Sequence, residues 1–389
     1  MTMKRRTTVK IGVITTQYAS NYGALLQTYA LQTYLNEYPD FDVEVLNYHP
    51  PFYKDCWKLL PKITGYGSLY LSCKSLALLG LTCINPKRLR LKKKRFENYK
   101  KFVKENIKCS KPYFSKEEIE SDFCPYDALI AGSDQIWNYK LMKNKKIERV
   151  WFLGLEGSYK NVKKIAYAPS VADKIPEDKK EEIKELLKDF KAVSVRESSD
   201  IKQIEPLYGG EIRHVCDPVF LLDKKRWAEF SKEPEIEEPY ICCYFLNPSA
   251  EAVGIVKEIK RITGLKTVLI DINDREKIKP DIDILDACPK EFVGLIKNAE
   301  MVITNSFHAT AFSVLFEKDL IVVKKKTANS RMESLLKVAG ISDRIKSLNE
   351  VKNMSKKDLK TDYNSDSNKL PDFIKSSEDY LKSALREEN

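Results

Sequence analysis

The sequence predicts an α/β protein made of two doubly wound domains that face a cleft. Short apolar runs alternate with helical stretches along most of the chain, which is the order of elements in a parallel sheet. A chain of 389 residues is too long for one ordinary core, so we expect two domains. The acidic segment 231–239 carries two prolines and little to bury, and it is the best linker candidate.

These features set the domain boundaries. We expect a first domain over residues 1–230, a second over 231–345 and a helical tail over 346–389. The tail has a helical pattern from Leu370 to Leu385 and is expected to pack back on the first domain. Two helical segments interrupt the alternation between about residues 50 and 122, so we read this region as an insertion in the first domain.

The first domain opens with a strand, a helix and a strand, predicted over 9–16, 24–35 and 42–48. The helix is expected to have one apolar face, formed by Ala24, Thr28, Leu31 and Leu35. Short apolar runs predict further strands over 127–133, 163–170, 192–197 and 213–218. Helical stretches over 176–190 and 196–204 lie between these strands, as a doubly wound sheet requires.

The second domain repeats the same rhythm beyond the linker. Its strands are predicted over 240–246, 266–271, 282–287, 300–305 and 319–326. Its helices are predicted over 249–264, 290–299 and 308–316, with a further helix opening near Arg331. Two open parallel sheets in tandem leave a cleft between their edges, and ligands bind there outside the carboxyl ends of the strands.

Composition points to a cytoplasmic protein. No apolar stretch reaches the length that spans a bilayer without a charge, and the run IGVI near the start is too short for a secretory signal. The nine cysteines are scattered, with no CxxC pair, so we expect buried free thiols and neither disulfides nor a metal site.

The net charge of +11 is concentrated in residues 86–108, just after an apolar stretch over 67–85. Nucleic acid is not an expected partner, because no recognised binding motif accompanies the charge. An apolar segment followed by a basic one is typical of peripheral membrane contact, here through residues 67–108, which would recruit a lipid-linked substrate. A helical hairpin that packs on its own protein would produce the same pattern.

A candidate anion site follows from the residues at the predicted strand ends. His308 lies at a strand-to-helix turn with Asn305 and Ser306, either of which can cap the next helix. A helix N-terminus suits a phosphate, and a histidine there can donate to the anion or carry a proton. Arg196 ends a predicted strand and Arg331 opens a helix, so both can bind phosphate or carboxylate, unless they form surface ion pairs.

Two further loops carry polar groups at strand ends. Ser133, Asp134 and Gln135 offer a hydroxyl, a carboxylate and an amide, which can bond sugar hydroxyls or abstract a proton, or serve only as a turn. The sequence Asn21-Tyr22-Gly23 opens the first helix, where glycine permits close backbone approach. The chain has no GxGxxG fingerprint and no P-loop, which speaks against dinucleotide and ATP chemistry.

Seven short motifs occur in one order along the chain: NYGALLQTYALQ, LIAGSDQIWN, KIAYAPSVA, SVRE, CDPVFLL, TNSFHATAFSVLF and SRMESLL. Together they resemble the polysaccharide pyruvyl transferase family, over roughly Val9 to Arg344. The resemblance implies two Rossmann-like domains similar to the B-type glycosyltransferase arrangement. It also implies phosphoenolpyruvate as co-substrate, a sugar hydroxyl pair on a glycan or lipid-linked precursor as acceptor, and a pyruvate ketal as product. No metal or other cofactor is implied.

The resemblance also assigns roles to residues. His308 corresponds to the donor-site histidine, a candidate proton donor, and Arg196 and Arg331 correspond to the arginines that would hold phosphate and carboxylate. Asn305 and Ser306 would line the same donor site. The acceptor would meet Asn21, Tyr22, Gly23, Ser133, Asp134 and Gln135, with Asp134 as a second catalytic candidate. Other branches of the family often carry an acid directly after the glycine, where this chain has Ala24.

Two other functions stay open from the sequence. A nucleotide-sugar glycosyltransferase would share the architecture, but retaining enzymes of that type often show two glutamates eight apart, and Glu291 and Glu300 are nine apart. A non-catalytic glycan-binding protein would explain a cleft but not the cations of an anion site. Binding of a nucleotide diphosphate or of phosphoenolpyruvate separates the first alternative from the pyruvyl transferase.

Overall fold

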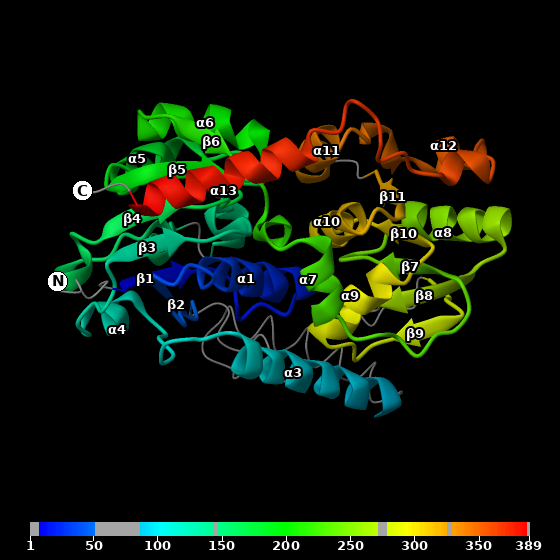
Figure 1. Cartoon of the computed structure of the whole chain (residues 1–389), viewed down its shortest axis with the longest axis horizontal. Helices are drawn as coiled ribbons and strands as arrows, with labels where there is room; N and C mark the ends of the chain where they lie inside the picture. The colour runs from blue at the N-terminus through cyan, green and yellow to red at the C-terminus, as the bar shows by residue number, and fades with distance from the viewer. Residues whose placement is uncertain (1–7, 51–85, 143–145, 271–277, 325–328, 387–389) are drawn as a thin grey trace, which may run out of the picture.

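The computed structural model describes residues 8–50, 86–142, 146–270, 278–324 and 329–386. Two α/β halves lie side by side, each built on a six-stranded parallel sheet (Figure 1). The predicted segment over 67–85 falls outside the described residues. Within the part that the structure describes, no helix is long and apolar enough to cross a membrane.

The first sheet has the strand order β2-β1-β3-β4-β5-β6, with every neighbouring pair parallel. Its strands are β1 (Val9–Ile14), β2 (Phe41–Val45), β3 (Ala128–Ala131), β4 (Lys163–Ala166), β5 (Phe190–Val195) and β6 (Ile212–His214). The second sheet has the order β12-β11-β10-β7-β8-β9 and is also parallel. Its strands are β7 (Tyr240–Tyr244), β8 (Lys266–Ile270), β9 (Ile282–Ile284), β10 (Met301–Thr304), β11 (Asp319–Val323) and β12 (Ile345–Lys346).

Helices connect the strands on both faces of each sheet. Those up to the start of the second sheet are α1 (Tyr22–Leu35), α3 (Pro86–Asn106), α4 (Lys116–Glu120), α5 (Lys180–Leu187), α6 (Ser198–Tyr208) and α7 (Lys224–Phe230). Those that follow are α8 (Ala250–Thr263), α9 (Pro289–Lys297), α10 (Phe307–Leu315), α11 (Ser330–Val338), α12 (Leu348–Lys352) and α13 (Leu370–Arg386). The two parallel sheets with helices between their strands confirm the predicted fold class.

Alternation along the strands divides the interior into three apolar clusters. In β3, Ile130 joins the cluster that contains residues of α1 and α13, whereas Leu129 joins the cluster that contains residues of α5 and α6. In β10, Val302 joins the same cluster as Ile130, and Ile303 faces α8. One apolar cluster therefore runs without a break from the first sheet to the second, and it holds the two halves together.

Helix α1 is buried almost all round, which corrects the prediction of a single apolar face. Thr28 and Gln27 are fully buried, although they are polar, and their side chains bond within the helix and to Thr15. Tyr22 stacks on Phe292 of α9 with ring centroids 4.6 Å apart. The helix therefore lies between the two halves, and both of its faces are covered.

The tail helix α13 returns from the second half to the first, where it crosses the view in red (Figure 1). Tyr380 donates its hydroxyl hydrogen to the carbonyl of Ala166 at 2.9 Å, and Ser377 accepts from the backbone N–H of Cys216 at 2.8 Å. These bonds tie the helix to the strand ends of the first sheet, because Ala166 ends β4 and Cys216 follows β6.

Candidate active site

Four side chains from both halves meet between the sheets. Asp134 follows β3, Arg196 follows β5 and Asp217 follows β6, while His308 lies in the first turn of α10. Arg196 Nη1 lies 2.7 Å from Asp217 Oδ2 and 3.9 Å from Asp134 Oδ1, and His308 Nε2 lies 3.5 Å from Asp217 Oδ2. The carboxyl ends of parallel strands thus bring residues far apart in the sequence to one place.

Arg196 is the buried cation of this cluster. Its Nε donates to Glu197 Oε1 at 2.8 Å, its Nη1 donates to Asp217, and its guanidinium lies 4.2 Å from the centre of the Phe307 ring. Burial alone would lower the pKa of Arg196, but Glu197, Asp217 and Asp134 outweigh burial and raise it. The guanidinium therefore stays charged, and its third nitrogen, Nη2, is buried without a hydrogen-bond partner in the described part of the chain.

Asp217 is the carboxylate that the other groups share. Besides Arg196, its Oδ2 accepts from Ser133 Oγ at 3.2 Å, and its Oδ1 accepts from the N–H of Val219 at 3.1 Å. Burial raises the pKa of Asp217, but His308 and Arg196 more than offset burial, so the pKa lies below its ordinary value. Asp217 is therefore a fully buried anion at neutral pH that faces two nitrogen groups.

His308 is held against the start of α1. A Cβ atom on Gly23 would lie 2.0 Å from His308 Nδ1, so only glycine allows the ring to approach the helix so closely. The separation of 3.5 Å between Nε2 and Asp217 Oδ2 is an ion-pair distance, and Nε2 makes no hydrogen bond with any residue that the structure describes. An imidazole nitrogen is thus buried beside a carboxylate and lacks a partner of its own, which a bound substrate can supply.

Arg331 is a second cation beside Arg196. It lies in the first turn of α11, and it forms no hydrogen bond or ion pair with any residue that the structure describes. Burial lowers the pKa of Arg331, the charge of Arg196 lowers it further, and Glu197 and Asp134 act in the opposite direction. Two neighbouring cations with unused donors form a site for an anion.

The loop after β3 is strained where it meets the cluster. The backbone of Asp134 has φ 69° and ψ −170°. Residues other than glycine rarely adopt this conformation, which costs roughly 1–3 kcal/mol. Its Oδ2 accepts from Thr16 Oγ1 at 3.1 Å. Gln135 turns toward its own loop, where its Oε1 accepts from Asn138 Nδ2 at 2.8 Å. The surrounding structure must keep Asp134 in this strained conformation, in which its carboxylate lies 3.9 Å from Arg196, and such strain is common at functional sites.

A family model for polysaccharide pyruvyl transferase matches residues 21–324, which is more than half of the chain. The chain belongs to the polysaccharide pyruvyl transferase family. It is accordingly a transferase, and the matched range contains His308, Arg196, Asp217 and Asp134. Arg331 lies just beyond the match.

Solved structures of other proteins resemble this fold. An S. aureus MnaA–UDP co-structure resembles this pyruvyl transferase family member with a TM-score of 0.50 and 12% identity, over 97% of each chain. UDP-GlcNAc 2-epimerase from Neisseria meningitidis has a TM-score of 0.48 and 10% identity, over 97% of this chain and 99% of that one. At such identity the likeness shows the fold alone, which is the B-type glycosyltransferase arrangement. A search of curated proteins finds no match.

The remaining predicted site residues at the starts of α1 and α10 make contacts within this pyruvyl transferase family member. Tyr22 is fully buried between the halves and donates its hydroxyl hydrogen to the carbonyl of Ala287 at 2.9 Å, so in this structure it packs between the halves. Ser306 is the N-cap residue of α10, but its side chain makes no cap bond. Asn305 accepts from the N–H of Leu246 at 3.0 Å and thus braces the loop after β7. Asn21 caps α1 by accepting from the N–H of Gly23 at 2.9 Å.

Three acidic residues at the site were not among the predicted site residues. Asp217 and Glu197 hold Arg196, and Asp200 accepts from the N–H of Val171 at 2.8 Å. Burial, followed by the charge of Glu197, raises the pKa of Asp200 to about 8. The available signal was position, because Glu197 and Asp217 both lie at the carboxyl ends of predicted strands, 192–197 and 213–218.

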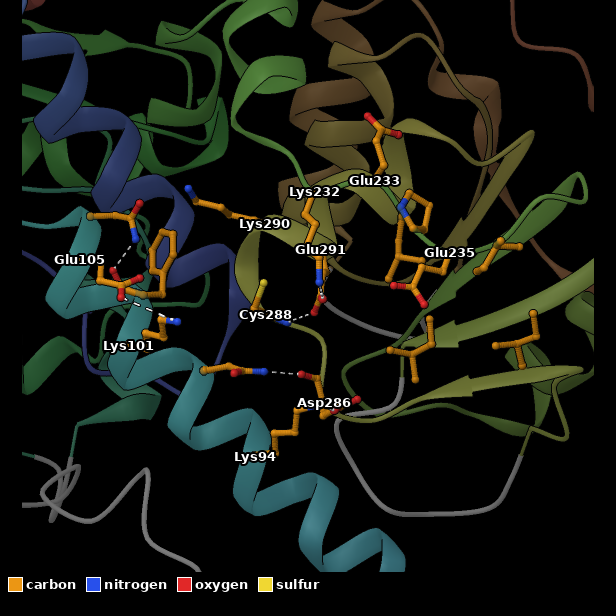
Figure 2. Close-up of a pocket in the computed structure, with 18 residues that line it drawn as sticks. Lys94, Lys101, Glu105, Lys232, Glu233, Glu235, Asp286, Cys288, Lys290 and Glu291 are labelled. Carbon is orange, nitrogen blue, oxygen red and sulfur yellow. Dashed lines mark hydrogen bonds and ion pairs between the residues drawn. The ribbon is translucent and has the colours of Figure 1, made fainter.

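The cluster has little open space in this structure. A small pocket lies beside it, lined by residues that include Arg196, Asp217, Phe307 and Ser334. A much larger pocket, with a volume of about 730 Å³, lies between α3, α9, β9 and the segment 232–236 (Figure 2). None of the predicted site residues lines this larger pocket.

Glu291 borders the larger pocket, where it accepts from the N–H of Cys288 at 2.8 Å and pairs with Lys232 (Figure 2). This carboxylate therefore caps α9. The described residues contain no group of histidine, cysteine or acidic side chains arranged to hold a metal ion.

Proposed function

We propose that this protein transfers the enolpyruvyl group of phosphoenolpyruvate to a pair of sugar hydroxyls and closes a pyruvate ketal, with release of phosphate. Membership of the family supports the reaction class. The observation that carries the proposal is the buried cluster in which His308 Nε2 and Arg196 Nη2 have no hydrogen-bond partner among the described residues, which also provide no partner for Arg331 nearby. Phosphoenolpyruvate carries a phosphate and a carboxylate, which together need several such donors.

In the proposed donor complex, Arg331 and Arg196 bind the two anionic groups. The donors of Arg331 make no hydrogen bond with described residues, so a ligand can use them. Arg196 offers Nη2, while its bonds to Glu197 and Asp217 fix the plane of its guanidinium. The first turn of α10 adds free backbone N–H groups and a positive partial charge beside Ser306. Asn305 fixes the loop that leads into this turn.

In the proposed reaction, the oxygen of one acceptor hydroxyl adds to C2 of phosphoenolpyruvate while a base takes the hydroxyl proton. A general acid delivers a proton to C3, which becomes a methyl group, and the proton held by the base later restores the acid. The second hydroxyl then attacks C2, the C2–O bond to phosphate breaks, and phosphate leaves with the electron pair. The proton of the second hydroxyl passes through a base to the released phosphate. His308, whose Nε2 lies 3.5 Å from Asp217 Oδ2, is the proposed proton donor to C3. These steps need no metal ion and no redox cofactor.

The proposed acceptor side is the loop after β3. Asp134 presents a carboxylate close to Arg196 and is the proposed base for a sugar hydroxyl. Ser133 is occupied by Asp217 and Gln135 by Asn138, so both serve mainly to shape this loop. Asn21 and Gly23 border the other side, where Gly23 contacts the ring of His308. An acceptor between these loops would meet the donor at the cluster.

Donor entry requires the site to open. Arg196, His308 and Asp134 are each less than a tenth exposed, and the pocket beside them is too small for phosphoenolpyruvate. Because His308 and Arg331 belong to the second half and Arg196 and Asp217 to the first, a small separation of the halves would admit the donor. Closure would then exclude water from the reacting atoms.

A turnover assay tests the proposal. Purified protein is incubated with phosphoenolpyruvate and a panel of glycans and lipid-linked oligosaccharides, while phosphate release and a new ketal methyl signal are followed by NMR. We expect both signals to appear together with at least one acceptor and to be lost in the variant His308→Ala. Turnover of a nucleotide sugar under the same conditions, without use of phosphoenolpyruvate, would replace the proposal with the glycosyltransferase alternative.

The location follows from the proposed acceptor. A glycan precursor made from phosphoenolpyruvate is assembled where that metabolite is found, so we propose a cytoplasmic enzyme. If the acceptor is lipid-linked, the enzyme works at the inner face of the cytoplasmic membrane. The predicted membrane contact over residues 67–108 remains part of this proposal, and its described portion is α3.

A further inference from the structure

Helix α3 carries most of the excess charge of the protein on the outside of the molecule. Its 21 residues include ten basic and two acidic side chains. In Figure 1 the helix lies along the outer edge, below α1 and α9. At 1.5 Å per residue it is about 30 Å long, so its charges are spread over a long and nearly straight line.

The helix has two different faces. The buried face contains Arg95, Phe96, Tyr99 and Phe102. The opposite face contains Arg90, Lys93, Lys100 and Lys104, all exposed and at helical spacing along one side. We name these four residues the lysine face. All three aromatic residues of the helix are buried, so the lysine face offers charge without aromatic groups.

Contacts along the inner edge of the helix fix its orientation. Lys94 pairs with Asp286 at 2.6 Å, on the wall of the larger pocket (Figure 2). Arg88 pairs with Asp283 at 3.1 Å, and Asn98 donates to the carbonyl of Asp286 at 2.7 Å. The helix is thus attached to the second half as well as to the first, and the lysine face is held pointing away from the protein.

The lysine face has almost no internal partners. Arg90, Lys100 and Lys104 form no hydrogen bond or ion pair with residues that the structure describes. Lys93 lies 3.9 Å from Glu97, and both side chains are more than half exposed, so this pair is worth little. The cations of the lysine face that have no partner among the described residues are available to an external anionic surface.

We propose that the lysine face docks the protein on an anionic lipid bilayer. A bilayer presents diffuse negative charge over an extended plane, which a line of ammonium groups on a rigid helix matches. Nucleic acid fits the face less well, because recognition of bases and phosphates favours arginine forks and stacking aromatic rings, and only Arg90 contributes either. The docking surface stands on charge and exposure alone and does not depend on the reaction proposed above.

Vesicle flotation with the full-length protein tests this surface. The vesicles contain either phosphatidylcholine alone or equal parts of phosphatidylcholine and phosphatidylglycerol, at low and at high salt. The test variant is Lys93→Gln/Lys100→Gln/Lys104→Gln. The matched control is Lys202→Gln/Lys257→Gln/Lys352→Gln, which removes the same charge from exposed positions on α6, α8 and α12. Circular dichroism and thermal melting check that both variants fold like the wild type.

We expect the wild type to float with anionic vesicles only, and less so at high salt. The test variant should partition on the order of a hundredfold more weakly, since each lysine near an anionic surface contributes roughly a fivefold effect. The control should bind like the wild type. No flotation of the wild type, equal loss in both variants, or tighter binding to a mixed-sequence DNA duplex than to anionic vesicles would each overturn the proposal.

Discussion

His308 Nε2 lies 3.5 Å from Asp217 Oδ2, and this relationship joins the two halves of the protein at the candidate active site. Asp217 follows β6 in the first sheet, whereas His308 opens α10 in the second half. The same carboxylate also holds Arg196 at 2.7 Å. A buried anion that organises two nitrogen groups from different halves makes the site depend on how the halves close.

The variant Asp217→Asn should impair both stability and activity. It keeps the shape of the side chain but removes the buried charge opposite Arg196 and His308, so we expect a loss of about 3 kcal/mol in the free energy of unfolding. Turnover should fall by at least about tenfold, because Arg196 and His308 lose the carboxylate that positions them. Chemical denaturation and phosphate release measure the two effects. Wild-type turnover in this variant would remove Asp217 from the account.

The variant Gly23→Ala tests the position of the His308 ring. The new Cβ would lie 2.0 Å from Nδ1, so the ring must move and turnover should fall by roughly tenfold or more. A matched control is Gly264→Ala, whose Cβ meets no atom within 4 Å but whose φ of +72° is strained by about 1 kcal/mol. The control should lose stability and keep turnover. Similar turnover in both variants would mean that the close contact with Gly23 is not needed.

The variant Arg331→Met should change stability and donor binding in opposite directions. Arg331 is a desolvated cation beside Arg196 without a partner among the described residues, so its removal should raise the free energy of unfolding by about 1 kcal/mol. Affinity for phosphoenolpyruvate should fall at least about tenfold, because a charged fork is lost. Arg331→Lys should restore part of the affinity. A variant that is destabilised yet binds normally would show that Arg331 is a structural residue.

Asp200 should make the protein less stable as pH rises. Its pKa is raised to about 8 in the folded state, above the ordinary value for an aspartate, so the folded protein binds more protons than the unfolded chain between these values. Stability from this group is therefore full at about pH 4 and is lost as pH rises through about 8. Asp200→Asn should melt like the wild type in acid and at a higher temperature near pH 9. A constant difference in melting temperature across this range would contradict the raised pKa.

The fold was predictable because the spacing of apolar residues along the sequence distinguishes strands from helices. Predicted strands generally extended past the observed ones at the carboxyl end, as in 9–16 against Val9–Ile14, because the sequence alone does not show where pairing with the neighbouring strand stops. Helix α1 was misjudged because its surroundings come from both halves of the chain. Burial of Gln27 and Thr28 depends on tertiary packing, which periodicity cannot report.

The site was predictable only in part. Position at strand ends identified Arg196, Asp134 and His308, and the structure brings these three together. The central place of Asp217 could not be read from the sequence, since it depends on which strand ends are neighbours across both sheets. The burial of Tyr22 could not be read from the sequence either, because its ring stacks on Phe292 of the other half.

Calorimetric titration of phosphoenolpyruvate into the wild type, His308→Ala and His308→Gln tests the central claim most directly. The account predicts saturable binding by the wild type, and binding at least about tenfold weaker in His308→Ala, a difference of roughly 1.4 kcal/mol. The glutamine variant should bind at an intermediate strength, because it keeps a hydrogen-bond donor but cannot deliver a proton. The absence of wild-type binding, or equal affinity in all three proteins, would contradict a donor site at the cluster of His308, Arg196 and Asp217.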